Sequence, residues 1–298
     1  MTEAVIVATS RSPIGRAFKG ALKDIRPDQL GAMMVQAALD KVPELDPASI
    51  DDLLLGCGMP GGEQGWNMAR VVAVLLGLDT VPGATITRYC SSSVQTTRMA
   101  MHAIRAGEGD TFISAGVECV SRFGIGGSDT PPVTPEDPKG LGPNPYLDLQ
   151  FDNAHTRSME RAKHPVGVWH DPREDGELPD YYINMGLTAE NVAGYCNVSR
   201  ADQDEFALRS QTLAAKALAN GFWAKEITPV TLPDGTVMDA DESPRAGTTL
   251  EGLSSLKPVF QVDGTVTAGN ASPLNDGAAA LVMPRYPATF SAVCPMLM

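Results

Sequence analysis

Basic residues are scarce in this sequence. Its 298 residues include 23 Lys and Arg against 36 Asp and Glu, which gives a formal net charge of -13. Nucleic acids and anionic membranes attract clustered Lys and Arg. The charge therefore argues against both classes of partner, and a polyanionic ligand would need a local basic point.

Nothing at the start of the sequence resembles an export signal, and long hydrophobic runs do not occur. Met1 is followed almost at once by a strand-like stretch at residues 5–8, without a basic region or a cleavage site. Uncharged runs such as residues 71–78 are far shorter than the roughly 18 to 20 apolar residues that a membrane-spanning helix needs. We expect a cytoplasmic protein without a membrane span.

Cysteine is sparse and shows no pairing pattern. The count of 5 is odd, and no Cys-x-x-Cys pair occurs, so neither a disulfide framework nor a zinc site is predicted. For four of the cysteines, a small buried hydrophobic residue is the favoured interpretation. These four are Cys57, Cys119, Cys196 and Cys294.

Strand-like and helix-like stretches alternate in the first part of the chain, which is typical of a largely parallel sheet covered by helices. The periodicity of apolar residues predicts the individual elements. The predicted strands are 4–8, 52–56, 84–87 and 111–116, and the predicted helices are 28–41, 67–76 and 92–106.

After residue 122 glycine and proline become frequent, which indicates a domain boundary or a large insertion. Within this region one long helix is predicted at residues 200–220, with acidic residues near its start and Gly221 just past its end. The α/β character returns at residues 265–282.

Cys90 is the informative cysteine, because it follows a short predicted strand and begins a predicted helix. A helix N-terminus carries free N–H groups and a partial positive charge, which favour a thiolate and can stabilise an oxyanion on its acyl group. A nucleophile would suit this position. On spacing alone, a small buried cysteine in a helix cap formed by Ser91, Ser92 and Ser93 is an equally good interpretation.

The residues around Cys90 resemble the signature of the acylated cysteine in the thiolase family. The segment Arg88-Tyr-Cys90-Ser-Ser-Ser-Val-Gln is similar to that signature, although Thr87 and Ser93 depart from its commonest letters. Further blocks carry the resemblance in order along nearly the whole chain. They lie at residues 6–15, 65–70, 185–193 with 199–204, and 264–278.

The resemblance implies an α/β fold, in which a thiolase-type N-terminal domain has a mixed sheet covered by helices. A coenzyme-A-binding loop domain is inserted into it. The expected boundaries are 1–122 with 267–283 for the N-terminal domain and 123–266 for the loop domain. Residues 284–298 are interpreted as a tail foreign to the family.

The resemblance also implies an activity: acetyl-CoA C-acyltransferase, which transfers an acyl group between a 3-ketoacyl-CoA and CoA through an acyl-cysteine at Cys90. Coenzyme A is then a substrate, and neither a tightly bound cofactor nor a metal is implied. A homo-oligomer formed through the N-terminal domain is expected. The cysteine signature and the long proline-rich loop favour a degradative member, as in fatty-acid β-oxidation.

Five residues match positions that contact coenzyme A in the family. Arg245 matches an arginine near the adenine and phosphate end, where a fixed cation suits a polyanion. Ala268 and Ser272 match residues that touch the pantetheine arm, and Met185 and Phe260 match residues that line the thioester channel. Alternatively, Met185 and Phe260 belong to the core and Arg245 is a rim charge.

Other catalytic motifs of the family are not found in residues 1–298. The resemblance implies a Gly-His-Pro histidine, an Asn-Glu-Ala-Phe motif and a second cysteine in Cys-x-Gly, all in a C-terminal domain that this sequence is expected to lack. His164, in His-Pro-Val-Gly, is interpreted as an exposed histidine, as are His102, His155 and His170. Turnover is therefore expected to be severely reduced.

Two rival interpretations remain open. One is a non-catalytic CoA-binding or assembly protein derived from a thiolase. The other is a ketoacyl synthase that uses a carrier protein, although the blocks at residues 185–193 and 267–272 argue for coenzyme A. The predicted helix 92–106 is apolar on more than one side, so it expects burial on both. Without the second domain, we expect one side of it to face water or a partner.

Overall fold

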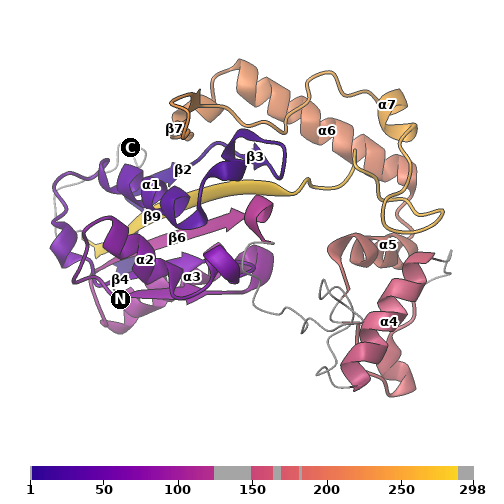
Figure 1. Ribbon diagram of the computed structural model, residues 1–298, viewed down its shortest axis with the longest axis horizontal. Coiled ribbons are helices and arrows are strands. Elements are labelled where there is room, and N and C mark those ends of the chain that lie inside the picture. Colours follow the sequence, from indigo (N-terminus) through magenta and orange to yellow (C-terminus); the bar gives the residue numbers. More distant parts are fainter. Residues whose placement is uncertain (1, 124–148, 164–168, 181–182, 288–298) are drawn as a thin grey trace, which may run out of the picture. The chain divides into compact units, whose positions relative to one another are not determined.

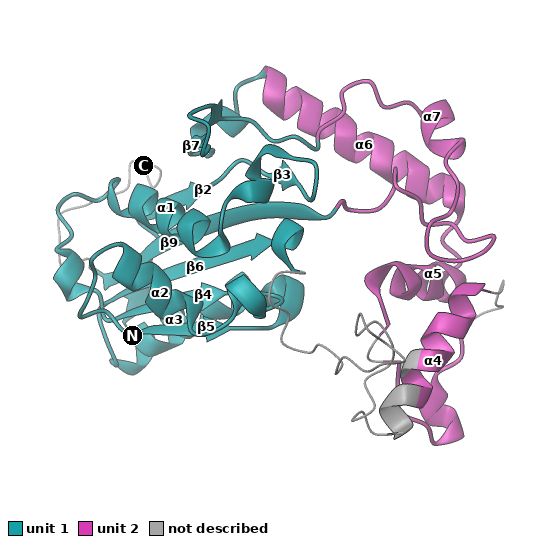
Figure 2. Cartoon of the chain, viewed as in Figure 1, with its two compact units in different colours: residues 1–128, 220–243, 274–298 teal, residues 129–219, 244–273 magenta. Residues whose placement is uncertain are grey.

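Residues 2–123, 149–163, 169–180 and 183–287 are described in the computed structural model of the protein. The chain folds into two compact units (Figure 2). The first unit contains residues 1–128, 220–243 and 274–298, and the second contains residues 129–219 and 244–273.

A mixed sheet lies at the centre of the first unit (Figure 1). One strand, β4, pairs in parallel with both β5 and β6, whereas β9 pairs with β6 in the antiparallel direction. These strands are β4 (Asp52–Gly56), β5 (Gly83–Ile86), β6 (Thr111–Cys119) and β9 (Asn275–Tyr286).

The start of the chain covers the other edge of β9 in three short antiparallel pieces, namely β1 (Glu3–Ala4), β2 (Ala8–Arg11) and β3 (Gly15–Arg16). Val282 shows the central place of β9, because it pairs with Ala8 on one side and with Ile113 on the other. The first and last parts of the unit are therefore joined through one strand.

The predicted α/β fold with a helix-covered mixed sheet is confirmed, but three sequence-based details are wrong. Alternation of strands and helices favoured a largely parallel sheet, whereas β9 returns from far along the chain and runs antiparallel to its neighbours. The expected strand at residues 4–8 is divided between β1 and β2. In addition, α/β structure resumes only with β9, since residues 265–274 contain no named strand or helix.

Helices cover both faces of the sheet. Alternate residues of a strand point to opposite faces, and β4 shows this plainly. Leu53 and Leu55 join the core cluster that contains residues of α1 (Pro27–Leu39) and α2 (Met68–Leu75). Leu54 joins a smaller cluster with Ile104 of α3 (Ser92–Ala106). The helix that follows Cys90 is thus packed on its own face of the sheet.

The outer side of α3 carries exposed apolar surface. Val94 is 71% exposed, and Met99 and Met101 are only partly buried against the smaller cluster. The buried face consists of Ser92, Thr96, Ala100 and Ile104. The apolar side chain of Val94 thus faces outward. The sequence predicted an uncovered side for this helix.

Residues 220–243 belong to the first unit, whereas the sequence placed them within the inserted loop domain. Arg11 of β2 gives the physical reason, since its guanidinium pairs with Glu226 at 2.7 Å and with Asp241 at 2.9 Å. The Arg11 guanidinium also lies 5.4 Å from the centre of the Trp223 ring. Contacts between distant segments, both charged and apolar, place this stretch in the first unit.

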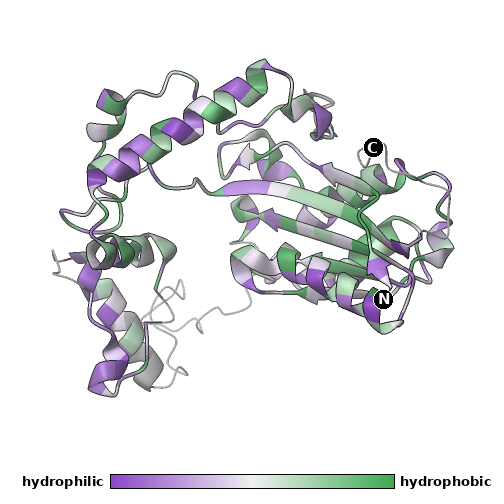
Figure 3. Cartoon of the chain, turned by 180° about the vertical axis from the view of Figure 1, so that it is seen from behind, coloured by the Kyte–Doolittle hydropathy of each residue, from purple (hydrophilic) through white to green (hydrophobic). Residues whose placement is uncertain are grey.

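The second unit contains four α-helices and connecting loops in the part that is described. Its helices are α4 (Leu149–Lys163), α5 (Met185–Cys196), α6 (Arg200–Ala219) and α7 (Leu250–Ser254). The long predicted helix corresponds to α6, along which polar and apolar residues are mixed (Figure 3). Across the described ranges, none of the helices is both long and apolar enough to span a membrane.

An ion-pair cluster in the first unit predicts a pH-dependent stability. Glu63 is 13% exposed and pairs with Arg26 at 2.9 Å and with Arg122. The hydrogen bond from Arg122 lowers the pKa of Glu63 below its usual value, and the positive charges of Arg122 and Arg26 act in the same direction. The ionised carboxylate therefore stabilises the fold above its unfolded pKa of about 4.3.

Replacing this glutamate, as in Glu63→Gln, should lower the free energy of unfolding by about 1–2 kcal/mol at pH 7. The difference from wild type should shrink as the pH falls through the lowered pKa, because the wild-type carboxylate is then protonated. Urea unfolding at pH 7 and at low pH measures this. The control Glu108→Gln changes an exposed glutamate of the same unit. A gap that stays constant with pH would contradict the expectation.

Candidate functional site

Cys90 lies in a short 3₁₀ turn, Tyr89–Ser91, which leads directly into α3. Its side chain is exposed. The alternative that Cys90 is a small buried residue in a helix cap is therefore wrong. An accessible thiol at the start of a helix is the arrangement that a nucleophile needs.

Hydrogen bonds from neighbouring serines hold this turn in a strained conformation. Tyr89 has a φ of +46°, which a residue with a bulky side chain rarely adopts. The Ser92 hydroxyl accepts a hydrogen bond from the Arg88 N–H at 2.8 Å and donates one to the Tyr89 carbonyl at 2.6 Å. The Ser91 hydroxyl donates to the Arg88 carbonyl at 2.9 Å. The serines therefore fix the backbone on either side of the cysteine.

Two glycines let the first turn of α3 approach the sheet closely. A Cβ at Gly56, the last residue of β4, would lie 2.7 Å from the backbone of Ser92 and of Ser93. A Cβ at Gly116 of β6 would lie 1.9 Å from the Ser93 hydroxyl oxygen. The position of the Cys90 turn thus depends on the absence of side chains at these two sheet positions.

Glu118 holds the segment that runs beside the turn. Its carboxylate accepts hydrogen bonds from the Gly58 N–H at 2.6 Å, the Met59 N–H at 3.3 Å and the Gln64 amide at 2.8 Å. Gly58 in turn accepts a hydrogen bond from the Thr87 hydroxyl at 3.0 Å. The chain just before the cysteine is therefore tied through Gly58 to a half-buried carboxylate.

The remaining cysteines divide into two kinds. Cys57 and Cys119 are buried, as predicted. Burial, together with the nearby Glu118 carboxylate, raises the pKa of Cys57 to about 12, and burial also raises the pKa of Cys119. Cys196 is exposed at the end of α5, so the expectation of a buried residue is wrong there. Cys294 lies outside the described residues.

The five residues predicted to contact coenzyme A all belong to the second unit. Arg245, Ala268 and Ser272 are exposed. Met185, the first residue of α5, is 69% exposed, so the core alternative is wrong for it. Phe260 is half-buried, and its ring lies where a Cβ on Gly186 would be 2.1 Å away. Two of the predicted residues, Met185 and Phe260, thus lie on the same part of the unit.

The histidines supply no described partner for Cys90. His102 is exposed on α3. His170 is exposed and lies 3.1 Å from Asp175. His164 and the side chain of His155 lie outside the described residues. In the part of the chain that the structure describes, no group of three or more His, Cys, Asp or Glu is arranged to hold a metal ion.

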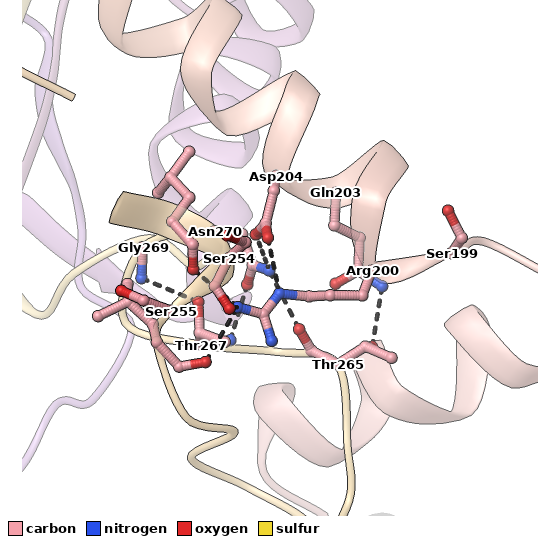
Figure 4. A network of polar contacts seen from close by, with 12 residues as sticks. Ser199, Arg200, Gln203, Asp204, Ser254, Ser255, Thr265, Thr267, Gly269 and Asn270 are labelled. Carbon is pink, nitrogen blue, oxygen red and sulfur yellow. Dashed lines mark hydrogen bonds and ion pairs between the residues drawn. The ribbon is translucent and has the colours of Figure 1, made fainter. Parts of the chain in front are cut away.

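Three of the blocks that resemble thiolases lie wholly or partly in the second unit, and the sequence assigned no role to their charged residues. The structure brings residues 185–193, 199–204 and 264–270 together through Glu190, Asp204 and Asn270. Figure 4 shows Asp204 and Asn270 beside each other. The only sequence signal was the presence of Glu190 and Asp204 inside two of these blocks. Their mutual contacts depend on the fold.

Comparison with known proteins identifies one family. The thiolase N-terminal domain matches residues 4–286. The chain is 40% identical to a 3-ketoacyl-CoA thiolase of Bacillus subtilis, and the alignment covers 100% of the chain. It is 39% identical to a beta-ketoadipyl-CoA thiolase of Acinetobacter baylyi, over 95% of the chain.

A solved structure shows the same fold. The crystal structure of the Bacillus anthracis acetyl-CoA acetyltransferase matches 96% of the chain with a TM-score of 0.74 and 36% identity. The chain spans 70% of the length of the Bacillus subtilis relative and 66% of the length of the other two.

Proposed function

Because this chain belongs to the thiolase family, we propose that Cys90 accepts an acyl group from an acyl-coenzyme A. The observation that carries the proposal is the exposed thiol in the strained turn that opens α3. This thiol lies within the segment that resembles the acylated-cysteine signature. The chain is accordingly proposed to be an acyltransferase of the acetyl-CoA C-acyltransferase class.

The proposed reaction breaks one carbon–carbon bond of the substrate and forms a new thioester, first on Cys90 and then on coenzyme A. The Cys90 sulfur attacks the 3-keto carbon of a 3-ketoacyl-CoA, the bond between C2 and C3 breaks, and acetyl-CoA leaves after gaining a proton at C2. The thiol of a second CoA then takes the acyl group from Cys90 and returns a proton to its sulfur. Run in reverse, the same steps form a carbon–carbon bond.

The proposed class of substrate is a 3-ketoacyl-CoA. The names of two relatives, 3-ketoacyl-CoA thiolase and beta-ketoadipyl-CoA thiolase, share the 3-keto thioester and differ in the rest of the acyl group. Comparing acylation of Cys90 by a monocarboxylic and a dicarboxylic 3-ketoacyl-CoA would separate these classes.

The exposed residues Arg245 and Ser272 are proposed to bind the phosphate end and the pantetheine arm of coenzyme A, respectively. An arginine suits the phosphates because its fixed charge and planar donors match a polyanion. Replacing it, as in Arg245→Ala, should raise the dissociation constant of CoA roughly tenfold to a hundredfold, the value of one hydrogen bond to a charged group. Ser272→Trp should also weaken binding by filling the space of the pantetheine arm.

Isothermal titration calorimetry with CoA measures these effects. The matched control is Arg209→Ala, which removes the same charge from an exposed arginine of α6 in the same unit and should leave affinity nearly unchanged. Equal affinity in wild type, Arg245→Ala and Ser272→Trp would show that coenzyme A binds elsewhere.

A second candidate function is a non-catalytic CoA-binding or assembly protein. The outward-facing Val94 on α3 favours it, since exposed apolar side chains can serve a partner. Stoichiometric acylation of Cys90 without release of product on adding CoA would support this candidate over the enzyme.

A further inference from the structure

A buried polar network in the second unit fixes residues 264–272, here called the 264–272 loop. Three side chains from two helices contribute to it: Glu190 of α5, and Arg200 and Asp204 of α6. Figure 4 shows Arg200 and Asp204 with their partners. Glu190 is 9% exposed and Asp204 is 3% exposed. Carboxylates are almost never this buried unless they are paired, so their partners define what the network does.

Glu190 binds the backbone at the start of the loop. Its carboxylate accepts hydrogen bonds from the Thr265 N–H at 2.9 Å, the Thr265 hydroxyl at 2.9 Å and the Val266 N–H at 2.8 Å. A Cβ on Gly264 would lie 2.4 Å from a Glu190 carboxylate oxygen. One side chain therefore binds two consecutive residues of the loop and packs against Gly264.

Asp204 binds the other end of the loop through Asn270. The Asn270 amide donates to Asp204 at 3.0 Å and to the Thr265 carbonyl at 3.0 Å, while its oxygen accepts a hydrogen bond from the Thr267 N–H at 2.7 Å. Asn270 thus closes the loop on itself. Asp204 holds Asn270 in the orientation that allows all three bonds.

Arg200 completes the network and connects it to α7. Its guanidinium pairs with Asp204 at 2.8 Å and donates to the Leu253 carbonyl at 2.8 Å and the Leu256 carbonyl at 3.0 Å. The charge of Asp204 is therefore balanced, and the end of α7 is held beside the loop. A Cβ on Gly269 would lie within 2.6 Å of Leu253 and Leu256, so the loop packs closely on this helix end.

The loop has an inner and an outer side. Thr267 is fully buried, and Val266 is 5% exposed. Ala268 and Ser272, which match pantetheine-contacting positions, are exposed. The hydrogen bonds of the network therefore fix the inner side of the loop, and the two residues proposed to meet the ligand lie on its outer side.

We infer that Glu190 and Asp204 are positioning residues, which hold the 264–272 loop ready to receive the pantetheine arm of coenzyme A. This inference rests on the proposed function. A loop that is already ordered loses less conformational freedom on binding, so the network raises affinity without touching the ligand. The block Ser199–Asp204 has no role in the proposed function itself. Here its role is to hold the 264–272 loop in position.

Two ligands distinguish positioning from general structural support. Coenzyme A has both an adenosine 3′,5′-bisphosphate end and a pantetheine arm, whereas free adenosine 3′,5′-bisphosphate has only the first. In Glu190→Gln an amide N–H group faces the backbone donors, and Asp204→Asn weakens the bond to Asn270. Each should raise the dissociation constant of CoA roughly tenfold to a hundredfold and leave that of the bisphosphate unchanged.

Calorimetry with both ligands, at a temperature well below the melting point of every variant, measures the ratio of the two dissociation constants. The control Glu205→Gln neutralises an exposed carboxylate next to Asp204 on α6 and should change neither value. If Glu190→Gln or Asp204→Asn does not fold, Thr265→Val decides, because it removes only the hydroxyl bonds to Glu190 and Gln203. It should weaken CoA binding several-fold and spare the bisphosphate.

The outcomes separate the inference from its premise. If the wild type binds neither ligand, the proposed function fails. If the wild type binds both ligands, and the variants weaken both equally or neither, coenzyme A binding stands and the positioning role is overturned.

Discussion

Iodoacetamide at pH 7.5 is expected to alkylate Cys90 and Cys196 in the folded chain and to leave Cys57 and Cys119 almost unmodified. The first two are exposed and the last two are buried. Burial raises the pKa of Cys57 to about 12, whereas an ordinary thiol with a pKa of about 8.5 carries roughly three thousand times more thiolate at this pH. Peptide mass spectrometry over a time course gives the four rates.

Denaturation supplies the control, because all cysteines should react at similar rates in strong denaturant. The variant Cys196→Ser should leave Cys90 as the fast site in the folded chain. Modification of Cys57 or Cys119 at a rate close to that of Cys90 would mean that these thiols are not enclosed by the sheet and helices, and the described core would be wrong.

The substitution Gly56→Ala is expected to cost about 1–3 kcal/mol of folding free energy and to displace the Cys90 turn. The new Cβ would lie 2.7 Å from backbone atoms of Ser92 and Ser93, and a backbone cannot rotate away as a side chain can. Either the sheet or the first turn of α3 must move. Thermal unfolding measures the stability, and the alkylation rate of Cys90 reports on the turn.

Gly31→Ala is the matched control for this substitution. Its Cβ would meet Val72 at 3.4 Å, an ordinary contact, and the residue lies inside α1. Alanine favours a helix over glycine, so this variant should be stabilised by up to about 1 kcal/mol. A Gly56→Ala chain as stable and as reactive at Cys90 as wild type would show that close packing does not set the position of the turn.

Local sequence patterns predicted those elements whose signals are contained within them. Residues 52–56 form β4 and residues 92–106 form α3, with the bounds expected from the sequence. Both have strong apolar patterns, and α3 ends at Gly107, whose φ of +79° suits glycine. The position of Cys90 at the start of this helix followed from the same pattern.

The rest depended on contacts between distant parts of the chain. The place of residues 220–243 in the first unit rests on the pairing of Arg11 with Glu226 and Asp241, which no local pattern encodes. The helices α4 and α5 were not predicted, because proline, glycine and polar residues dominate that region. The contact between Glu190 and Thr265 likewise joins residues far apart in the sequence.

Peptide mapping by mass spectrometry after incubation with a 3-ketoacyl-CoA tests directly whether Cys90 is the acyl acceptor. One acyl group is expected on the peptide that contains Cys90, and none on Cys196 although it is exposed. Cys90→Ser should abolish the label. An acyl group on Cys196, or no acyl group in a chain that binds coenzyme A, would contradict the assignment of Cys90 as the acyl acceptor.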